Sequence, residues 1–198
     1  MKKNNCRVCG SGDFTEILDY GNVALADGFL DGVRNINGEK TYPLHLVICQ
    51  ECRHVQIQEV LDPGILFRHY VYETGTSASV RHYAHTFVND VLLRAPAGLT
   101  IPRVLEIASN DGTVLSCFRQ ANCEVLGIDP ATNIAKLANA KGINTLSAFF
   151  SKDIALNICK DMGKWDIIVA RNVLAHVKEL HSVIDGTRLL LNGDGFCV

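Results

Sequence analysis

The sequence contains no long apolar run and no cluster of basic residues. Its 198 residues carry a formal net charge of −2, with 19 Lys and Arg against 21 Asp and Glu. A membrane-spanning helix needs about 20 consecutive apolar residues, and no segment approaches that length. The basic stripe of a general nucleic-acid-binding protein is absent as well. We therefore expect no membrane and no nucleic acid as partner, and a small-molecule substrate remains.

The start of the chain lacks the features of a secretory signal. Met1 to Asn5 runs directly into Cys6, without the apolar stretch that follows the basic residues of a signal peptide. This predicts a cytoplasmic protein, in which thiols stay reduced. The eight cysteines are therefore expected to be metal ligands, core residues or reactive groups before disulfides.

Half of the cysteines form two Cys-x-x-Cys pairs, Cys6 with Cys9 and Cys49 with Cys52. Each such turn brings two thiolates to one tetrahedral ion, so two turns complete a four-sulfur zinc site. A redox pair or unrelated core cysteines are the alternatives, but a redox motif leaves the second pair unexplained. The spacing predicts structural Zn²⁺, which would stabilise a segment too small and polar for a good core.

The composition divides the chain into three parts. Residues 1–60 are rich in turn-forming residues and short apolar runs, which indicates a β-rich zinc-binding module. Residues 61–100 predict a helical connector, and its amphipathic helix is expected to end before the helix-breaking segment Ala95–Gly98. Five apolar residues of this connector recur at helical spacing: Tyr83, Phe87, Val88, Val91 and Leu92.

Apolar strands alternate with helical patterns over residues 101–198. The strands are predicted at Arg103–Ala108, Glu124–Ile128, Ile143–Ala148 and Asp166–Ala170, with a fifth beginning at Phe196–Val198. The helices are predicted at Thr113–Ala121, Asn133–Lys141, Ser151–Asp161 and Val177–Leu191. This alternation is typical of an α/β fold with a parallel, doubly wound, Rossmann-like sheet.

The first strand of this region leads through a short loop into a helix. Small residues at Ala108, Ser109 and Gly112 allow the backbone to approach a ligand closely, at the edge of the sheet where ligands bind. The loop is neither a dinucleotide G-x-G-x-x-G motif nor a phosphate-binding P-loop. Asp129 closes the second strand, about 20 positions further on, where a carboxylate can accept both ribose hydroxyls. A turn aspartate before Pro130 is the alternative.

Six separated motifs resemble one known family, the sugar C-methyltransferases that act on nucleotide-linked keto-deoxysugars. One is the cysteine set. The other five stretches are Tyr70–Ser79, Glu106–Thr113, Gly127–Ala135, Phe149–Phe150 and Ala170–Val177. The resemblance implies a class I methyltransferase core that uses S-adenosylmethionine, with residues 61–100 covering the active site. The sheet of that family resembles a seven-stranded one, so the core over 101–198 is expected to be truncated at its C-terminal end.

The resemblance also implies a role for individual residues. Those expected to bind the cofactor are Glu106, Ala108, Asn110, Gly112, Asp129, Phe150 and Asn172, with Asp129 on the ribose and Phe150 near the adenine. Those expected at the methyl-transfer site are His176, Tyr72 and Tyr70, beside Asn172. In the family a Glu-His pair in a C-terminal domain is the expected general base, and this sequence ends before any such pair.

The chemistry of carbon methylation explains these residue types. A proton alpha to a carbonyl must be removed and the enolate stabilised, which a base tuned near neutral pH and a hydroxyl donor can do. His176 and Tyr72 are suitable, although a structural histidine and a core tyrosine remain alternatives.

Three functions are compatible with the sequence. The first is a C-methyltransferase in incomplete form. The second is an inactive zinc- and cofactor-binding remnant, or one subunit of a split enzyme completed by a separate C-terminal chain. The third is an N- or O-methyltransferase acting, for example, on RNA, against which the lack of a basic surface and of an Asn-Pro-Pro-Tyr-like motif weighs.

Overall fold

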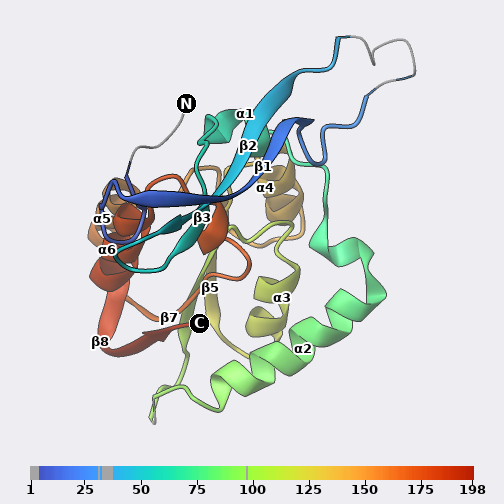
Figure 1. The fold of residues 1–198 in the computed structure, drawn as a ribbon. Helices are drawn as coiled ribbons and strands as arrows, with labels where there is room; N and C mark the ends of the chain where they lie inside the picture. Colours follow the sequence, from blue (N-terminus) through green and yellow to red (C-terminus); the bar gives the residue numbers. More distant parts are fainter. Residues whose placement is uncertain (1–4, 31, 33–37, 97) are drawn as a thin grey trace. The chain divides into compact units, whose positions relative to one another are not determined.

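The computed structural model describes residues 5–30, 32, 38–96 and 98–198. It divides the chain into two compact units, residues 1–66 and 67–198 (Figure 1). The sequence predicts three parts, with boundaries after residues 60 and 100, and this division stays a prediction. The predictions that concern residues 1–4 and Ala97 lie outside the described residues.

The first unit contains a three-stranded antiparallel sheet in the order β1-β2-β3. Its strands are β1 (Phe14–Ala24), β2 (Thr41–Cys49) and β3 (Val55–Ile57). Among the described residues of this unit, the buried apolar side chains are few: Cys6, Val47 and Cys49. So small a core favours stabilisation by a bound ion over stabilisation by apolar packing alone.

The second unit contains a five-stranded sheet in the order β6-β5-β4-β7-β8, and every neighbouring pair is parallel. Its strands are β4 (Arg103–Ile107), β5 (Glu124–Ile128), β6 (Thr145–Leu146), β7 (Trp165–Val169) and β8 (Leu191–Cys197). The strand order reverses direction at β4, and in open parallel sheets such a switch point marks the ligand crevice.

Helices cover both faces of this sheet (Figure 1). They are α2 (Ala78–Leu92), α3 (Thr113–Gln120), α4 (Thr132–Ala140), α5 (Lys152–Met162) and α6 (Leu180–Leu190). Because side chains alternate along a strand, Val104 packs with α2, α3 and α4, whereas Leu105 and Ile107 pack with α5 and α6. The prediction of a doubly wound α/β unit is therefore confirmed.

The connector is helical only in part. Short α1 (Pro63–Phe67) and the 3₁₀ turn η2 (Thr74–Thr76) flank a stretch without regular secondary structure before α2 begins. The hydroxyl of Ser77 caps α2 by accepting the N–H of Val80. The buried face of α2 carries Ala84, Val88 and Val91, whereas Tyr83, predicted on that face, is 51% exposed.

Three predicted elements differ clearly in length from the observed ones. The last strand, β8, begins at Leu191 rather than at Phe196, directly after α6 ends. The last helix begins at Leu180 rather than at Val177, because residues 174–176 form a separate 3₁₀ turn, η3 (Leu174–His176), and Val177 is extended with ψ 139°. The third strand is only two residues long, because its ladder reaches no further than Gly127 and Ile128 of β5. Within the described part of the chain, every helix is too short or too polar to cross a membrane.

Candidate cofactor site and metal centre

The loop after β4 is shaped by backbone angles that few residues adopt. Ala108, Asn110 and Gly112 have φ values of 55°, 51° and 74°, and the N–H of Gly112 bonds to the carbonyl of Ser109 at 3.2 Å. A Cβ atom on Gly112 would lie 3.0 Å from side-chain carbons of Ile143. Only glycine fits this position, so the loop turns tightly and the backbone stays accessible to a ligand.

Asp129, at the end of β5, is joined to this loop. Its Oδ2 accepts the backbone N–H of Asn110 at 2.8 Å, and its Oδ1 accepts that of Ala131 at 2.9 Å. Burial raises the pKa of this carboxyl, while the N–H groups of Ala131 and Asn110 oppose the rise. The structure thus brings together the loop and the acidic residue that the sequence singles out.

Glu106, at the end of β4, pairs with an arginine that the sequence does not single out. Its Oε1 accepts from Nη2 of Arg171 at 3.1 Å and from Nε at 3.3 Å. Its Oε2 is buried and has no hydrogen-bond partner among the described residues, as is also true of the Ser109 hydroxyl. Burial raises the pKa of Glu106 to about 7, although Arg171 lowers it. Buried polar atoms without partners at this edge fit a site that takes a polar ligand.

Residues 68–76, here named the strap, lie against the loop after β4 and the start of α4. Two asparagine side chains hold it in place, and each bonds the strap backbone twice. Asn133 donates to the carbonyl of Tyr70 at 2.7 Å and accepts its N–H at 3.2 Å. Asn110 donates to the carbonyl of Tyr72 at 3.0 Å and accepts the N–H of Thr74 at 2.8 Å. The strap therefore lies next to the loop after β4, which is the predicted cofactor loop.

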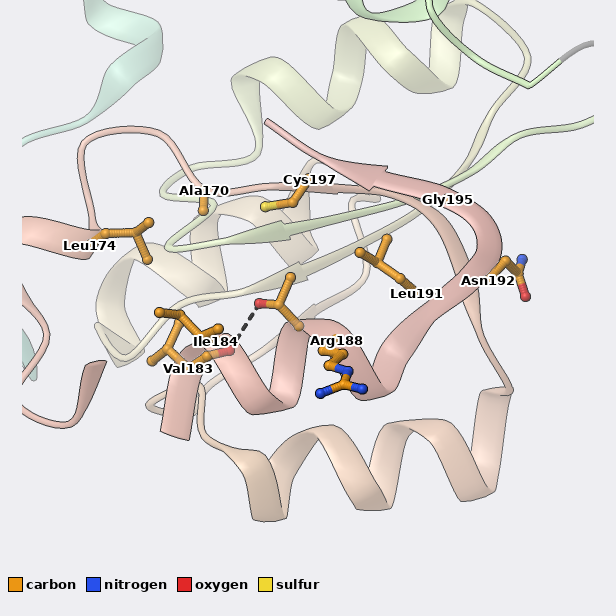
Figure 2. Close-up of a pocket in the computed structure, with 10 residues that line it drawn as sticks. Ala170, Leu174, Val183, Ile184, Arg188, Leu191, Asn192, Gly195 and Cys197 are labelled. Atoms are coloured by element: carbon orange, nitrogen blue, oxygen red, sulfur yellow. Dashed lines mark hydrogen bonds between the residues drawn. The ribbon is translucent and has the colours of Figure 1, made fainter. Parts of the chain in front are cut away.

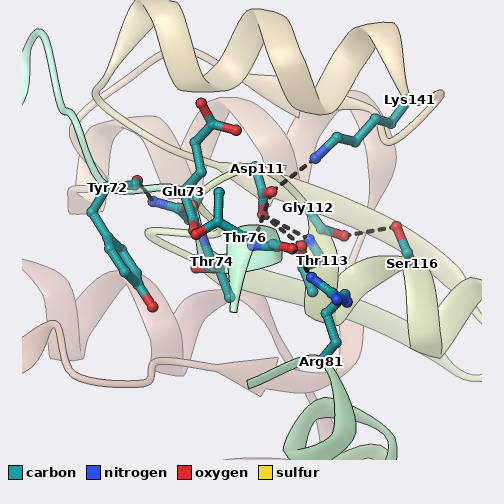
Figure 3. A network of polar contacts seen from close by, with 12 residues as sticks. Tyr72, Glu73, Thr74, Thr76, Arg81, Asp111, Gly112, Thr113, Ser116 and Lys141 are labelled. Carbon is teal, nitrogen blue, oxygen red and sulfur yellow. Dashed lines mark hydrogen bonds and ion pairs between the residues drawn. The ribbon is translucent and has the colours of Figure 1, made fainter. Parts of the chain in front are cut away.

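Asp111 is the centre of the polar network that fixes the end of the strap (Figure 3). Its carboxylate accepts from Nζ of Lys141 at 2.8 Å, from Oγ1 of Thr113 at 2.7 Å and from the N–H of Gly75 at 3.1 Å. Burial raises the pKa of this carboxyl, but the bonds from Lys141, Thr113 and Gly75 outweigh it and hold the pKa below its usual value. Asp111 is thus a structural anchor.

Three residues that shape the site were missed at the level of sequence. Asp111 and Asn133 lie inside motifs that mark the family resemblance, yet nothing in the sequence shows which backbone groups they bind. Arg171 likewise lies inside the motif Ala170–Val177, next to the predicted Asn172, and its partner Glu106 cannot be read from that motif.

Two of the predicted catalytic residues, Tyr70 and His176, lie near the ring of Phe67, and the third, Tyr72, is exposed at the surface. The ring of Phe67 lies 6.2 Å from that of Tyr70 and 6.3 Å from that of His176, between centroids. His176 ends η3 and is exposed, and Tyr72 is 45% exposed. Asn172 is exposed with φ 52°. The structure thus brings Tyr70 and His176 to Phe67.

The two phenylalanines after β6 face different surroundings. Ring atoms of Phe150 lie 3.2 Å from the position that a Cβ on Gly186 of α6 would take, so Phe150 packs against that helix. The ring of Phe149 instead faces the guanidinium of Arg68, 5.7 Å from its centroid. The adenine contact of Phe150 stays a prediction, and its ring belongs to the apolar core under α6.

The four predicted metal ligands converge in the first unit. The Sγ atoms of Cys6, Cys9, Cys49 and Cys52 all lie within 4.8 Å of one another. The pairs Cys6–Cys52 and Cys9–Cys49 are 3.6 and 3.5 Å apart. Burial raises the pKa of the Cys6 thiol, but the N–H groups of Cys9 and Val8 and the thiol of Cys52 lower it to about 7. Four thiols at this spacing fit a closed tetrahedral Zn²⁺ site.

A hollow of 420 Å³ lies elsewhere in the second unit, between α6 and β8 (Figure 2). None of the predicted site residues lines it. Its walls are mainly apolar, from residues that include Leu174, Val183, Ile184 and Leu191. It carries no cluster of titratable groups comparable to the loops after β4 and β5.

The parallel sheet, the tight loop after β4 and the acidic residue after β5 define the architecture of a class I methyltransferase. Residues 80–198 match the family described as a methyltransferase domain, and residues 6–67 match a zinc binding domain. Since the methyltransferase match covers more than half of the chain, the protein belongs to that family.

One relative and two solved structures give the degree of similarity. The chain is 34% identical over 193 residues to the C-methyltransferase NovU of Streptomyces niveus, an alignment that covers 97% of this chain and 46% of NovU. The chain thus spans about half the length of this relative.

The solved structures that resemble this chain are less similar to it in sequence than NovU is. The magnesium protoporphyrin IX methyltransferase ChlM of Synechocystis PCC 6803 shows 16% identity and a TM-score of 0.44, over 57% of this chain and 54% of ChlM. The plantazolicin methyltransferase BpumL shows 16% identity and a TM-score of 0.46, over 59% of this chain and 44% of BpumL.

Proposed function

We propose that the protein is the N-terminal part of an S-adenosylmethionine-dependent C-methyltransferase whose substrate is a nucleotide-linked keto-deoxysugar. The observation that carries this proposal is the bond between the Asn110 N–H and Asp129, which joins the ligand loop to its acidic partner. The similarity to a C-methyltransferase along 97% of the chain supports the type of reaction.

The residues around the loop are suited to the cofactor. Asp129 would bind the ribose hydroxyls, since a carboxylate accepts two of them. Ala108, Asn110 and Gly112 would contact the cofactor along the loop after β4. Glu106 would face the methionine part of the cofactor. The cofactor supplies an electrophilic methyl group on a sulfonium centre when it is bound.

The sugar would be activated by removal of a proton alpha to its carbonyl. His176 is the candidate base and the hydroxyl of Tyr70 or Tyr72 the candidate donor to the enolate oxygen. Tyr70 and His176 share a contact with Phe67, which supports their assignment to one site. Asn172, in the same segment as His176, would complete the wall of this site.

The four cysteines would hold one structural Zn²⁺ in a closed site, because four sulfurs leave no open coordination position. The activity of the whole protein would need further sequence, because the relative is about twice as long. A separate C-terminal chain could supply it. The second candidate function is a zinc- and cofactor-binding remnant or subunit without activity of its own.

Calorimetric titration of the zinc-loaded chain with S-adenosylhomocysteine tests the cofactor site. We expect binding that weakens roughly tenfold or more in Asp129→Ala, because charge-assisted hydrogen bonds are lost. Asp185→Asn is the control, since its side chain is 56% exposed on α6. Equal affinity of wild type and Asp129→Ala would remove Asp129 from the site, and no binding by the wild type would overturn the proposal.

Transfer of a labelled methyl group to nucleotide-linked 4-keto-deoxysugars separates the two candidate functions. Label on a sugar carbon, by the chain alone or with a complementing chain, supports the enzyme. Cofactor binding without transfer in both conditions supports the remnant.

A further inference from the structure

The ion pair between Glu106 and Arg171 is only half complete. Both bonds from Arg171 reach the same oxygen, Oε1, and leave the buried Oε2 without a partner among the described residues. A purely structural pair would be expected to take the fork-to-fork form, in which an arginine bonds both oxygens of a carboxylate.

Arg171 also keeps donors for another group. A guanidinium has five N–H donors, and the bonds of Arg171 to Glu106 use its Nε and Nη2 atoms. Its side chain is 21% exposed, whereas that of Glu106 is 1% exposed. The pair therefore presents a buried carboxyl oxygen without a partner among the described residues, together with guanidinium donors that the bonds to Glu106 do not use.

Arg171 lies near an aromatic side chain of α2, and Glu106 lies close in sequence to the predicted ligand loop. The guanidinium of Arg171 lies 5.3 Å from the centroid of Phe87, a residue of α2. A cation at this distance from an aromatic ring is attracted to it, which restrains the guanidinium. Glu106 is two residues before Ala108, at the carboxyl end of the strand where the order of the sheet reverses.

We propose that Arg171 and Glu106 together form a receptor for a free amino acid group, in which Arg171 binds the carboxylate and Oε2 of Glu106 accepts the ammonium. The inference rests on the proposed function, because the ligand that carries this group would be the methionine end of the cofactor. It adds Arg171 as the residue that distinguishes a cofactor with its carboxylate from one without it.

Titrations with three adenosyl compounds test this assignment. S-adenosylhomocysteine carries the whole amino acid group, decarboxylated S-adenosylmethionine keeps only the ammonium, and 5′-methylthioadenosine has neither. We expect Arg171→Met to weaken the binding of S-adenosylhomocysteine roughly 10- to 100-fold. It should leave the affinities for the other two compounds unchanged within about twofold.

Two further variants serve as a control for Arg171→Met and as its replacement. Arg188→Met changes an exposed arginine of α6 and should leave all three affinities unchanged. Arg171→Lys, which keeps the charge without the fork, should give an intermediate loss for S-adenosylhomocysteine only; it replaces Arg171→Met if circular dichroism shows that this variant does not fold.

Equal losses for all three compounds, or no loss for any, would overturn the role of Arg171 and leave the proposed function standing, provided that the wild type binds. A wild-type chain that binds none of them would overturn both.

Discussion

The backbone N–H of Asn110 bonds to Oδ2 of Asp129 at 2.8 Å, while the side chain of Asn110 bonds the strap at Tyr72 and Thr74. One residue thus joins the loop after β4, the end of β5 and the strap. Its φ of 51° lets the backbone N–H point toward Asp129 while the side-chain amide points toward the strap. Asparagine tolerates this left-handed conformation better than most residues, which explains why it can serve both contacts.

Gly112→Ala is expected to destabilise the protein by about 2–4 kcal/mol. The substitution places a Cβ in a left-handed conformation and 3.0 Å from Ile143, so strain and overpacking act together. Urea unfolding at neutral pH measures the effect. Gly193→Ala is the matched control, because nothing lies within 4 Å of its Cβ position, and its change should stay below about 0.5 kcal/mol. Similar stability of the two variants would show that the loop tolerates a side chain.

Asn133→Ala is expected to release the strap. The substitution removes both bonds to the backbone of Tyr70, which hold the strap near the start of α4. Hydrogen exchange followed by mass spectrometry should show faster exchange of residues 68–76, with little change in β4 and β5. Lys136→Ala, at an exposed position of the same helix, should leave the exchange of the strap unchanged. Equally slow exchange in Asn133→Ala would mean that other contacts suffice.

The elements of the second unit could be predicted because their patterns are local. The strands β4, β5 and β7 are mainly apolar runs. The helices α3, α4 and α5 begin and end within one residue of the predicted bounds. The convergence of the four cysteines follows from their spacing alone.

The contacts that shape the site could not be predicted, because they depend on partners far away in the sequence. Asn133 binds a backbone 63 residues earlier, and Arg171 pairs with a carboxylate 65 residues earlier. Nothing in either local sequence specifies such a partner. For the same reason Phe150 carries no sequence signal that would separate an adenine contact from packing against Gly186.

The first unit is expected to contain about one zinc ion per chain. Cys9→Ser should lose most of the metal, because three thiolates hold Zn²⁺ less tightly than four and the exposed side chain of Cys9 adds little to the core. Elemental analysis of the purified protein gives the stoichiometry. Cys159→Ser, on α5, should retain the metal content of the wild type. A folded wild-type sample without metal would contradict the assignment.

Glu106 is expected to make the stability of the protein depend on pH near neutrality. Its pKa rises from 4.5 to about 7 in the folded chain, so between these values the folded state binds a proton that the unfolded chain has released. The free energy of unfolding contributed by Glu106 therefore falls as the pH rises through this range, by about 1.4 kcal/mol per pH unit at most, and levels off above it. Glu106→Gln removes this dependence. The unfolding free energy of the wild type minus that of Glu106→Gln should accordingly decrease between pH 5.5 and 7.5, measured by urea unfolding with both proteins zinc-loaded.

Glu124→Gln is the control for this dependence. Its hydrogen bond with Arg103 lowers the pKa of Glu124, so the stability from Glu124 is complete above its usual pKa and is lost only at more acid pH. The wild type minus Glu124→Gln difference should stay flat between pH 5.5 and 7.5. An equally flat difference for Glu106→Gln would mean that Glu106 keeps an ordinary pKa. In that case Arg171 would compensate its burial fully, and the unpartnered Oε2 would carry no measurable cost.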